Sequence, residues 1–325
     1  NRVTVELDFT PPAALPAFRS LTDLQAVPLV GRETELAEIA SEWQICQAGN
    51  SRLVLITGPA GMGKTRLVEE AVSRIPGSGV TVLTGNCYAI EAGTPYQLIS
   101  DLLRGAIEGV ADRLPPIMQA DLAQLVPALQ GGRSTRPTAP PAGATETTVR
   151  LQEAITQVIR LLASAERGLW LVAEDLHWAD PASLACLNHA LRRCGDLPLM
   201  VLATLRDEEV SYDSPLMDWP RRSVHAPAPT TVIRLRPLPP DDLQQLLDQV
   251  VAEDAGMILS QLYRETAGNP FFVVETLRAL AEQGAVYRAP GGRWRLREEA
   301  VSRLASLPVT EAVLDMIRQR TRRLS

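Results

Sequence analysis

Short apolar runs alternate with amphipathic segments through the first two thirds of the chain. The apolar runs predict strands at residues 53–57, 80–83, 169–173, 199–204 and 231–235. Apolar residues at helical spacing predict helices at residues 36–43, 66–73, 98–110, 113–127, 151–162 and 181–193. Because strands that alternate with helices are typical of parallel sheets covered on both faces, the pattern predicts an α/β fold.

The pattern changes at both ends of this region. Residues 1–28 contain an alternating stretch at 3–9 and then proline-rich sequence, and we expect a linker from an upstream domain. Low-complexity sequence at 130–147 predicts a loop. From Pro239 helices dominate, at 243–251, 258–263 and 271–281, followed by a hairpin of 286–288 with 292–296 and a helix through Val313 and Ile317. The predicted domains are a nucleotide-binding domain at 29–236, a helical subdomain at 237–283 and a hairpin-containing region at 284–325.

Composition limits the function classes. A length of 325 residues predicts two or three domains, and a formal net charge of −6 leaves no overall basic field for binding nucleic acid. The cysteines at 46, 87, 186 and 194 form no CxxC pair, which argues against a disulfide framework or a zinc site and favours the reducing cytoplasm. No apolar run approaches the length of about 18 residues that a membrane span needs, so we expect a soluble protein. The chain starts at Asn1, and we expect it to be part of a larger protein.

The segment Gly58–Thr65 reads GPAGMGKT and fills the template GxxxxGK[ST]. In such a P-loop, glycines let backbone N–H groups point at phosphate oxygens, the lysine reaches the outer phosphates and the hydroxyl meets Mg²⁺. A predicted strand precedes the segment and a predicted helix follows it, which places the phosphates at a helix N-terminus. Lys64 is the only lysine of the chain, which favours a specific need for its ammonium group. The predicted nucleotide-binding residues here are Gly58, Ala60, Gly61, Met62, Gly63, Lys64, Thr65 and Arg66.

Two carboxylates follow the predicted strand 169–173, at Glu174 and Asp175. An apolar strand that ends in two acids fits the second half of a P-loop ATPase, where one carboxylate orients the shell of Mg²⁺ and its neighbour polarises the attacking water. Ligands of doubly wound sheets bind at the carboxyl ends of the strands, so this segment and the P-loop should meet. His177 together with these acids is an alternative set of metal ligands.

Arg206 follows the predicted strand 199–204. An arginine at that position can reach the γ-phosphate and distinguish ATP from ADP by charge. The alternative is a surface arginine that pairs with the acidic residues at 207–209.

Five motifs in order carry a resemblance to a known family: LVGRE (29–33), GPAGMGKT (58–65), WLVAEDLHWAD (170–180), ATLR (203–206) and AGNPFF (267–272). The chain resembles the STAND class of AAA-like, NB-ARC-related signalling ATPases, and especially the nucleotide-binding domain of large bacterial transcription regulators of the LuxR (MalT-like) or SARP type. The resemblance implies an α/β P-loop NTPase with a parallel five-stranded sheet of order 5-1-4-3-2, a helical subdomain and the start of a winged helix. It also implies that Val30, Arg32 and Pro270 flank the adenine. From spacing alone, the alternative role for Arg32 and Glu33 is a solvated helix start.

The function expected from these residues is a slow, Mg²⁺-dependent ATPase that binds ATP or ADP and controls conformation and self-association. Lys64 holds phosphates, Thr65 and Glu174 hold Mg²⁺ (Glu174 through water), Asp175 orients the water and Arg206 senses the γ-phosphate. DNA would be bound only by a domain outside this chain. One departure from the family is Glu174, where aspartate is usual. The alternatives are a nucleotide-bound scaffold without turnover, an initiator-like AAA+ loader and a P-loop kinase of small molecules.

Overall fold

The computed structural model describes residues 29–74, 79–91, 93–126, 144–165, 167–210, 216, 228–251, 255–288 and 294–297. The chain divides into two compact units, one of them Gly31–Arg236 and the other Asn1–Val30 with Pro237–Ser325. The predicted linker at 1–28 and the predicted last helix through Val313 lie outside the described residues.

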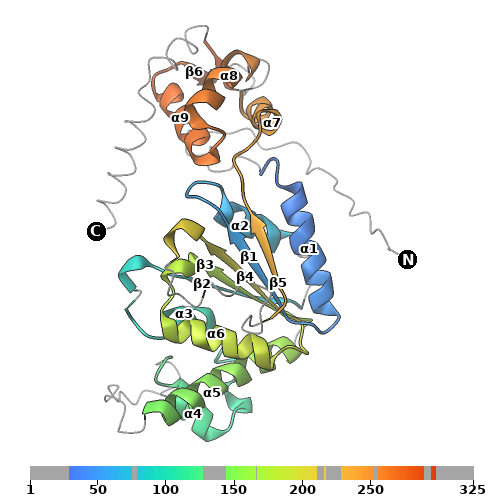
Figure 1. Ribbon diagram of the computed structural model, residues 1–325, viewed down its shortest axis with the longest axis vertical. Helices are drawn as coiled ribbons and strands as arrows, with labels where there is room; N and C mark the ends of the chain where they lie inside the picture. The colour runs from blue at the N-terminus through green and yellow to red at the C-terminus, as the bar shows by residue number, and fades with distance from the viewer. Residues whose placement is uncertain are drawn as a thin grey trace. The chain divides into compact units, whose positions relative to one another are not determined.

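The larger unit is built on a parallel sheet (Figure 1). Its strands are β1 (Arg52–Thr57), β2 (Thr81–Asn86), β3 (Leu169–Glu174), β4 (Leu199–Leu205) and β5 (Thr230–Arg234). They lie in the order β2-β3-β4-β1-β5, which is the predicted order 5-1-4-3-2 counted from the opposite edge, so the predicted sheet is confirmed. β4 therefore lies between β1 and β3, and the carboxyl ends of all three meet at one edge of the sheet.

Helices cover both faces of this sheet. They are α1 (Glu33–Gln47), α2 (Lys64–Ser73), α3 (Gln97–Leu103), α5 (Ala144–Ala165) and α6 (Pro181–Arg193). A further helix, α4 (Pro116–Leu122), packs against α5. Leu53 and Leu55 of β1 belong to a large buried cluster with α3, α5 and α6. Trp170 of β3 points to the other face, where its ring meets Trp43 of α1 edge-on at 5.4 Å between centroids. Both faces are buried, which is why the central strands read as continuous apolar runs.

Four short 3-10 helices complete the larger unit within the described residues: η2 (Ala89–Glu91), η3 (Ala111–Arg113), η5 (Leu176–Trp178) and η6 (Asp207–Glu209). Two of them, η5 and η6, directly follow the carboxyl ends of β3 and β4.

Two predicted helices are shorter than the spacing of apolar residues indicated. The helix predicted at 113–127 is limited to α4, Pro116–Leu122. The other prediction ran over 98–110, but α3 ends at Leu103 and turns follow. Gly105 and Gly109 fall in this second half, and glycine costs a helix about 1 kcal/mol relative to alanine. Val110 is nevertheless buried. The spacing of apolar residues therefore predicted correctly that Val110 is buried, but wrongly that the helix continues to it. The predicted loop at 130–147 is also too long, because α5 begins at Ala144.

The second unit contains α7 (Pro240–Val251), α8 (Ala255–Thr266), α9 (Pro270–Glu282) and an antiparallel hairpin of β6 (Val286–Arg288) with β7 (Trp294–Leu296). Apolar residues of these helices and of the hairpin form one buried cluster, which includes Val30. The predicted helices and hairpin are present. The winged helix itself remains a prediction, because residues 298–325 lie outside the described part of the chain.

The AGNPFF motif includes the start of α9, and the structure explains why glycine, asparagine and proline occupy three of its positions. Gly268 has φ +72°, and a Cβ there would come within 2.2 Å of the carbonyl oxygen of Leu238. The side chain of Asn269 caps the helix by accepting from the N–H of Phe271 at 3.1 Å. Pro270 occupies the first helical position, which proline favours because its missing N–H is not needed there.

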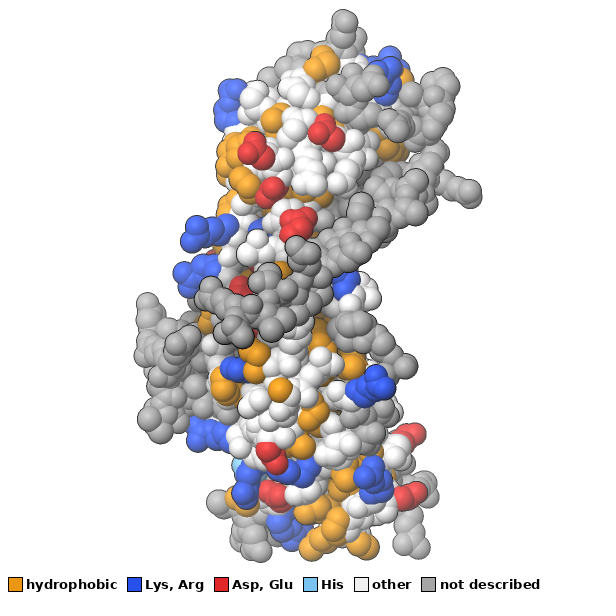
Figure 2. All heavy atoms as spheres, turned by 90° about the vertical axis from the view of Figure 1, so that its right-hand side faces the viewer, with side chains coloured by type: hydrophobic (Ala, Val, Ile, Leu, Met, Phe, Trp, Pro, Cys, Tyr) orange, Lys and Arg blue, Asp and Glu red, His pale blue; other side chains and the backbone are white. Residues whose placement is uncertain are grey.

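On the face drawn in Figure 2, basic and acidic side chains are interspersed, in keeping with the net charge of −6. No helix among the described residues combines the length and the apolar character that a membrane crossing requires.

Candidate active site

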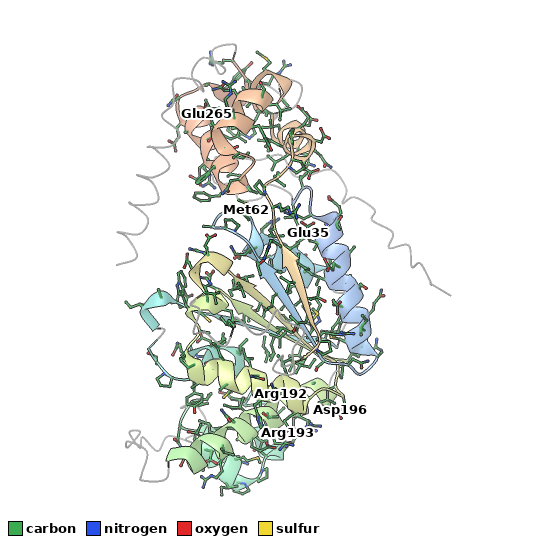
Figure 3. All side chains as sticks on the ribbon, in the orientation of Figure 1. Glu35, Met62, Arg192, Arg193, Asp196 and Glu265 are labelled. Carbon is green, nitrogen blue, oxygen red and sulfur yellow. The ribbon has the colours of Figure 1, made fainter. Side chains whose placement is uncertain are left out.

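The loop between β1 and α2 is shaped by glycines. Gly58, Gly61 and Gly63 have φ values of +145°, +81° and +84°, which favour glycine. A Cβ on Gly58 would come within 2.9 Å of the carbonyl oxygen of Leu235, so glycine is needed for packing there. A Cβ on Gly63 would meet no heavy atom within 4 Å, so the loop leaves open space beside this backbone. The loop therefore has a conformation that leaves backbone groups accessible to a ligand. Figure 3 labels Met62, which lies on this loop.

The ammonium group of Lys64 lies against the same loop. Lys64 is the first residue of α2 and is 8% exposed. Its Nζ donates to the carbonyl oxygens of Gly58 at 2.7 Å and Pro59 at 2.9 Å. The positive charge is therefore held at the loop by neutral acceptors, which an anionic phosphate oxygen could replace with a stronger, charge-assisted bond.

The carboxylate of Glu174 connects the P-loop to the two central strands. Its Oε2 accepts from Oγ1 of Thr65 at 2.8 Å and from Oγ1 of Thr204 at 3.0 Å. Glu174 is 8% exposed, and burial raises the pKa of its carboxyl, while the two hydroxyls act to lower it and the charges of Asp175 and Glu69 act to raise it. The structure thus brings together the two predicted Mg²⁺ ligands.

Asp175 stands beside this carboxylate with a left-handed backbone, φ 52° and ψ 46°, which is unusual for a residue other than glycine. Its N–H donates to Oγ1 of Thr204 at 2.9 Å, and its side chain is one third exposed. The carboxylate of Asp175 is therefore in contact with solvent at the end of β3, and its role with water remains a prediction.

Thr204 was not predicted as a site residue. Its hydroxyl donates to Glu174 and accepts from the N–H of Asp175, so one side chain holds both acids. The signal in the sequence is a polar residue near the end of an apolar strand. Its partners lie 29 and 30 positions away, and they become apparent only from the parallel pairing of β3 and β4.

His177 lies in η5 with a fully buried side chain. Its Nε2 is 3.2 Å from Oε2 of Glu209, and its Nδ1 is 4.0 Å from Oδ1 of Asp175. Burial lowers the pKa of His177, the nearby charges of Arg206 and Lys64 lower it further, and the charges of Asp175 and Glu209 oppose them. The alternative role of His177 in a metal site gains no support, because the described residues contain no group of three or more His, Cys, Asp or Glu side chains arranged to hold a metal.

The guanidinium group of Arg206 is paired. Its Nη1 donates to Oε1 of Glu209 at 2.6 Å, and its Cζ lies 5.3 Å from the centroid of the Trp178 ring. The predicted sensor therefore lies at the same end of the sheet as the acids, with one of the predicted acidic neighbours as its partner.

The other predicted nucleotide-binding residues are placed as follows. Arg32 precedes α1 and is 5% exposed. Its guanidinium donates to the carbonyl oxygen of Arg236 at 2.6 Å and is paired with Glu35 at 3.1 Å. The alternative of a solvated helix start is therefore wrong for Arg32, whereas Glu33 is exposed in the first turn of α1. Glu35 is labelled on α1 in Figure 3. The side chain of Arg66 is 41% exposed and faces two carboxylates of its own helix. Val30 and Pro270 belong to the second unit, and their role at the adenine remains a prediction.

The fold and this site together define a P-loop nucleoside triphosphatase. The AAA ATPase domain family matches residues 28–202, more than half of the chain, and the chain belongs to this family. It is accordingly an AAA-type ATPase that binds nucleotide, and family membership implies ATP hydrolysis with Mg²⁺.

Among curated proteins, an uncharacterised protein of Rhizobium meliloti (strain 1021) is 28% identical over 269 residues. That match covers 76% of this chain and 24% of the relative, so the chain spans about a quarter of the length of this relative.

Several solved structures are similar to the chain. The Walker-type ATPase of Pyrococcus abyssi is 14% identical with a TM-score of 0.48, covering 91% of this chain and 77% of that one. A STAND protein with a tetratricopeptide repeat sensor from Pyrococcus horikoshii is 17% identical with a TM-score of 0.40, covering 75% and 29%. Thermotoga maritima RuvB is 15% identical with a TM-score of 0.44, covering 86% and 70%.

The double role of Thr204 gives a testable prediction. Thr204→Val keeps the shape of the side chain and removes the hydroxyl that bonds Glu174 and Asp175. We expect the free energy of unfolding, measured by urea titration, to fall by about 1 to 3 kcal/mol, because buried polar groups lose their partners.

The control is Thr57→Val, since Oγ1 of Thr57 is equally buried and has no hydrogen-bond partner among the described residues. That change should be neutral or stabilising. Equal losses in the two variants would contradict a special role for the Thr204 hydroxyl.

Proposed function

We propose that this chain is a slowly hydrolysing ATP/ADP switch domain of a bacterial transcriptional regulator, in which nucleotide controls conformation and self-association. The observation that carries the proposal is the shared oxygen of Glu174, which accepts from Thr65 of the P-loop and from Thr204 of β4. This contact supports a single site at which the glycine loop and the acidic strand end act on the same triphosphate.

The loop would hold the phosphates. Backbone N–H groups of residues 61–65 and the ammonium of Lys64 supply positive partial and full charge at the N-terminus of α2. Gly63 leaves room beside the backbone for phosphate oxygens. The motif LVGRE at 29–33, through its resemblance to STAND ATPases, supports a place for Arg32 beside the adenine.

Thr65 and Glu174 fit a magnesium ion. Both offer oxygen atoms, which Mg²⁺ prefers, and their oxygens are 2.8 Å apart at the mouth of the loop. When bound, the ion would neutralise charge on the phosphates during transfer. Glu174 would orient the water shell of the ion and Thr65 would supply a hydroxyl ligand, while Thr204 keeps the carboxylate in place.

Asp175 would orient the attacking water. Its carboxylate is partly exposed beside Glu174, so a water molecule can reach it. Its backbone N–H is held by Thr204, which keeps the carboxylate in a fixed position for hydrogen bonding to that water. Arg206 would contact the γ-phosphate, since a cation there interacts with ATP and has no equivalent partner in ADP.

Such a site can act as a switch only through a difference in nucleotide affinity between two conformations. We propose that ADP favours a closed, inactive form and that ATP favours an open, self-associating form. The transcriptional output would come from a DNA-binding domain outside this chain. A location in the cytoplasm follows from this output and from the four free cysteines.

Lys64→Ala should weaken the binding of ATP about 100-fold or more in titration calorimetry, because a charge-assisted contact to the phosphates is lost. Arg74→Ala is the matched control, since Arg74 ends the same helix with an exposed guanidinium that pairs with Glu70. Unchanged affinity in Lys64→Ala would refute the assignment of the phosphate site.

Asp175→Ala should bind ATP with nearly parental affinity and release phosphate at least about 100-fold more slowly, because the water is no longer oriented. Phosphate release from the purified parental protein also tests the second candidate, a scaffold without turnover. Hydrolysis at the parental rate in the variant would place the base elsewhere.

Self-association can be measured directly on the chain. Sedimentation velocity with Mg–ADP and with a non-hydrolysable ATP analogue should give a larger species with the analogue, because the two nucleotides favour different conformations. Identical sedimentation with both nucleotides would argue against control of assembly within this chain.

A further inference from the structure

Glu209 is the ion-pair partner of Arg206, the predicted phosphate sensor. Oε1 of Glu209 lies 2.6 Å from Nη1 of Arg206, in a contact whose two side chains are 35% and 27% exposed. The ring of Trp178 lies against the same guanidinium, with 5.3 Å between Cζ and the ring centroid. The guanidinium of Arg206 therefore already has an anionic partner within the chain.

The other oxygen of Glu209 lies beside a buried ring. Oε2 lies 3.2 Å from Nε2 of His177, whose side chain is fully buried. Nδ1 of His177 accepts from the N–H of Arg206 at 3.4 Å. Nε2 has no hydrogen-bond partner of ordinary geometry among the described residues. The ring of His177 therefore contacts both the backbone of Arg206 and the carboxylate of Glu209, beside their ion pair.

This arrangement sets two anions against one cation. When ATP binds, the γ-phosphate can replace Glu209 as the partner of Arg206, which breaks the ion pair. If Glu209 instead stays in place, the negatively charged phosphate must bind close to its carboxylate. Both outcomes cost free energy when ATP binds, and neither applies to ADP, which lacks the γ-phosphate.

We propose that Glu209 sets the preference of the site between ATP and ADP, by competing with the γ-phosphate for Arg206 from a position beside the buried ring of His177. The inference rests on the proposed function, in which Arg206 contacts the γ-phosphate. Glu209 is a positioning residue, because it acts through Arg206.

The test is Glu209→Gln, a change that keeps the size of the side chain and removes its charge. Titration calorimetry with Mg–AMP-PNP and with Mg–ADP should show AMP-PNP binding about 3- to 10-fold tighter than in the parental protein, the range expected for a partly exposed ion pair with a hydrogen bond to charge. The affinity for ADP should change less than about twofold.

The matched control is Glu208→Gln, the same change of charge at the adjacent, exposed residue of η6. It should leave both affinities within about twofold of the parental values. A gain equal to that of Glu209→Gln would show a general charge effect and would overturn the inference. Weaker AMP-PNP binding in Glu209→Gln would also overturn it, because Glu209 would then position Arg206 for the phosphate.

A second background separates this inference from the proposed function. In Arg206→Ala, the effect of Glu209→Gln on AMP-PNP should disappear, since the group they compete for is gone. If Arg206→Ala binds both nucleotides as the parental protein does, the sensor assignment in the proposed function fails. If Arg206→Ala loses the preference and Glu209→Gln leaves it unchanged, only the role of Glu209 fails.

Discussion

The site depends on one oxygen atom, Oε2 of Glu174, and on the two hydroxyls that donate to it. One hydroxyl comes from the start of α2 and the other from the end of β4, so the contact joins three elements of the sheet edge. A buried carboxylate is costly to desolvate unless its oxygens are bonded, which makes both threonines part of the stability of the site. In the proposed function, one of these two hydroxyls, that of Thr65, would also be a ligand of the magnesium ion.

The fold makes this contact possible through the order of its strands. β4 lies between β1 and β3, and parallel pairing brings their carboxyl ends to one edge. Some of the residues with positive φ lie at the same edge, namely the glycines of the P-loop and Asp175. Such conformations are retained where surrounding structure fixes them, and here the N–H of Asp175 is held by Thr204.

The parts of the site that the sequence predicted are those with a local signal. GPAGMGKT is contiguous, and the two acids directly follow an apolar strand. These residue types and spacings were sufficient to predict that the loop and the acids lie at the same edge of the sheet. The strand order came from the family resemblance, because five similar apolar runs do not specify their neighbours. Thr204 was not assigned, since its contacts depend on the parallel register of β3 and β4. Pairing of Arg206 with the acids at 207–209 was the stated alternative for this arginine, but the sequence did not identify Glu209 among the three, because that choice depends on side-chain conformation. The continuous helix predicted at 98–110 failed because helical spacing of buried residues does not require helical backbone.

The position of Lys64 has a consequence for covalent chemistry. Because it is the only lysine, a reagent that acylates ε-amino groups has a single side-chain target in this chain, and that target is 8% exposed with its nitrogen bonded to two carbonyl oxygens. Acylation would remove the charge of Lys64, and it requires the amine to leave these acceptors. The extent of labelling would then report how often the loop opens, without any engineered probe.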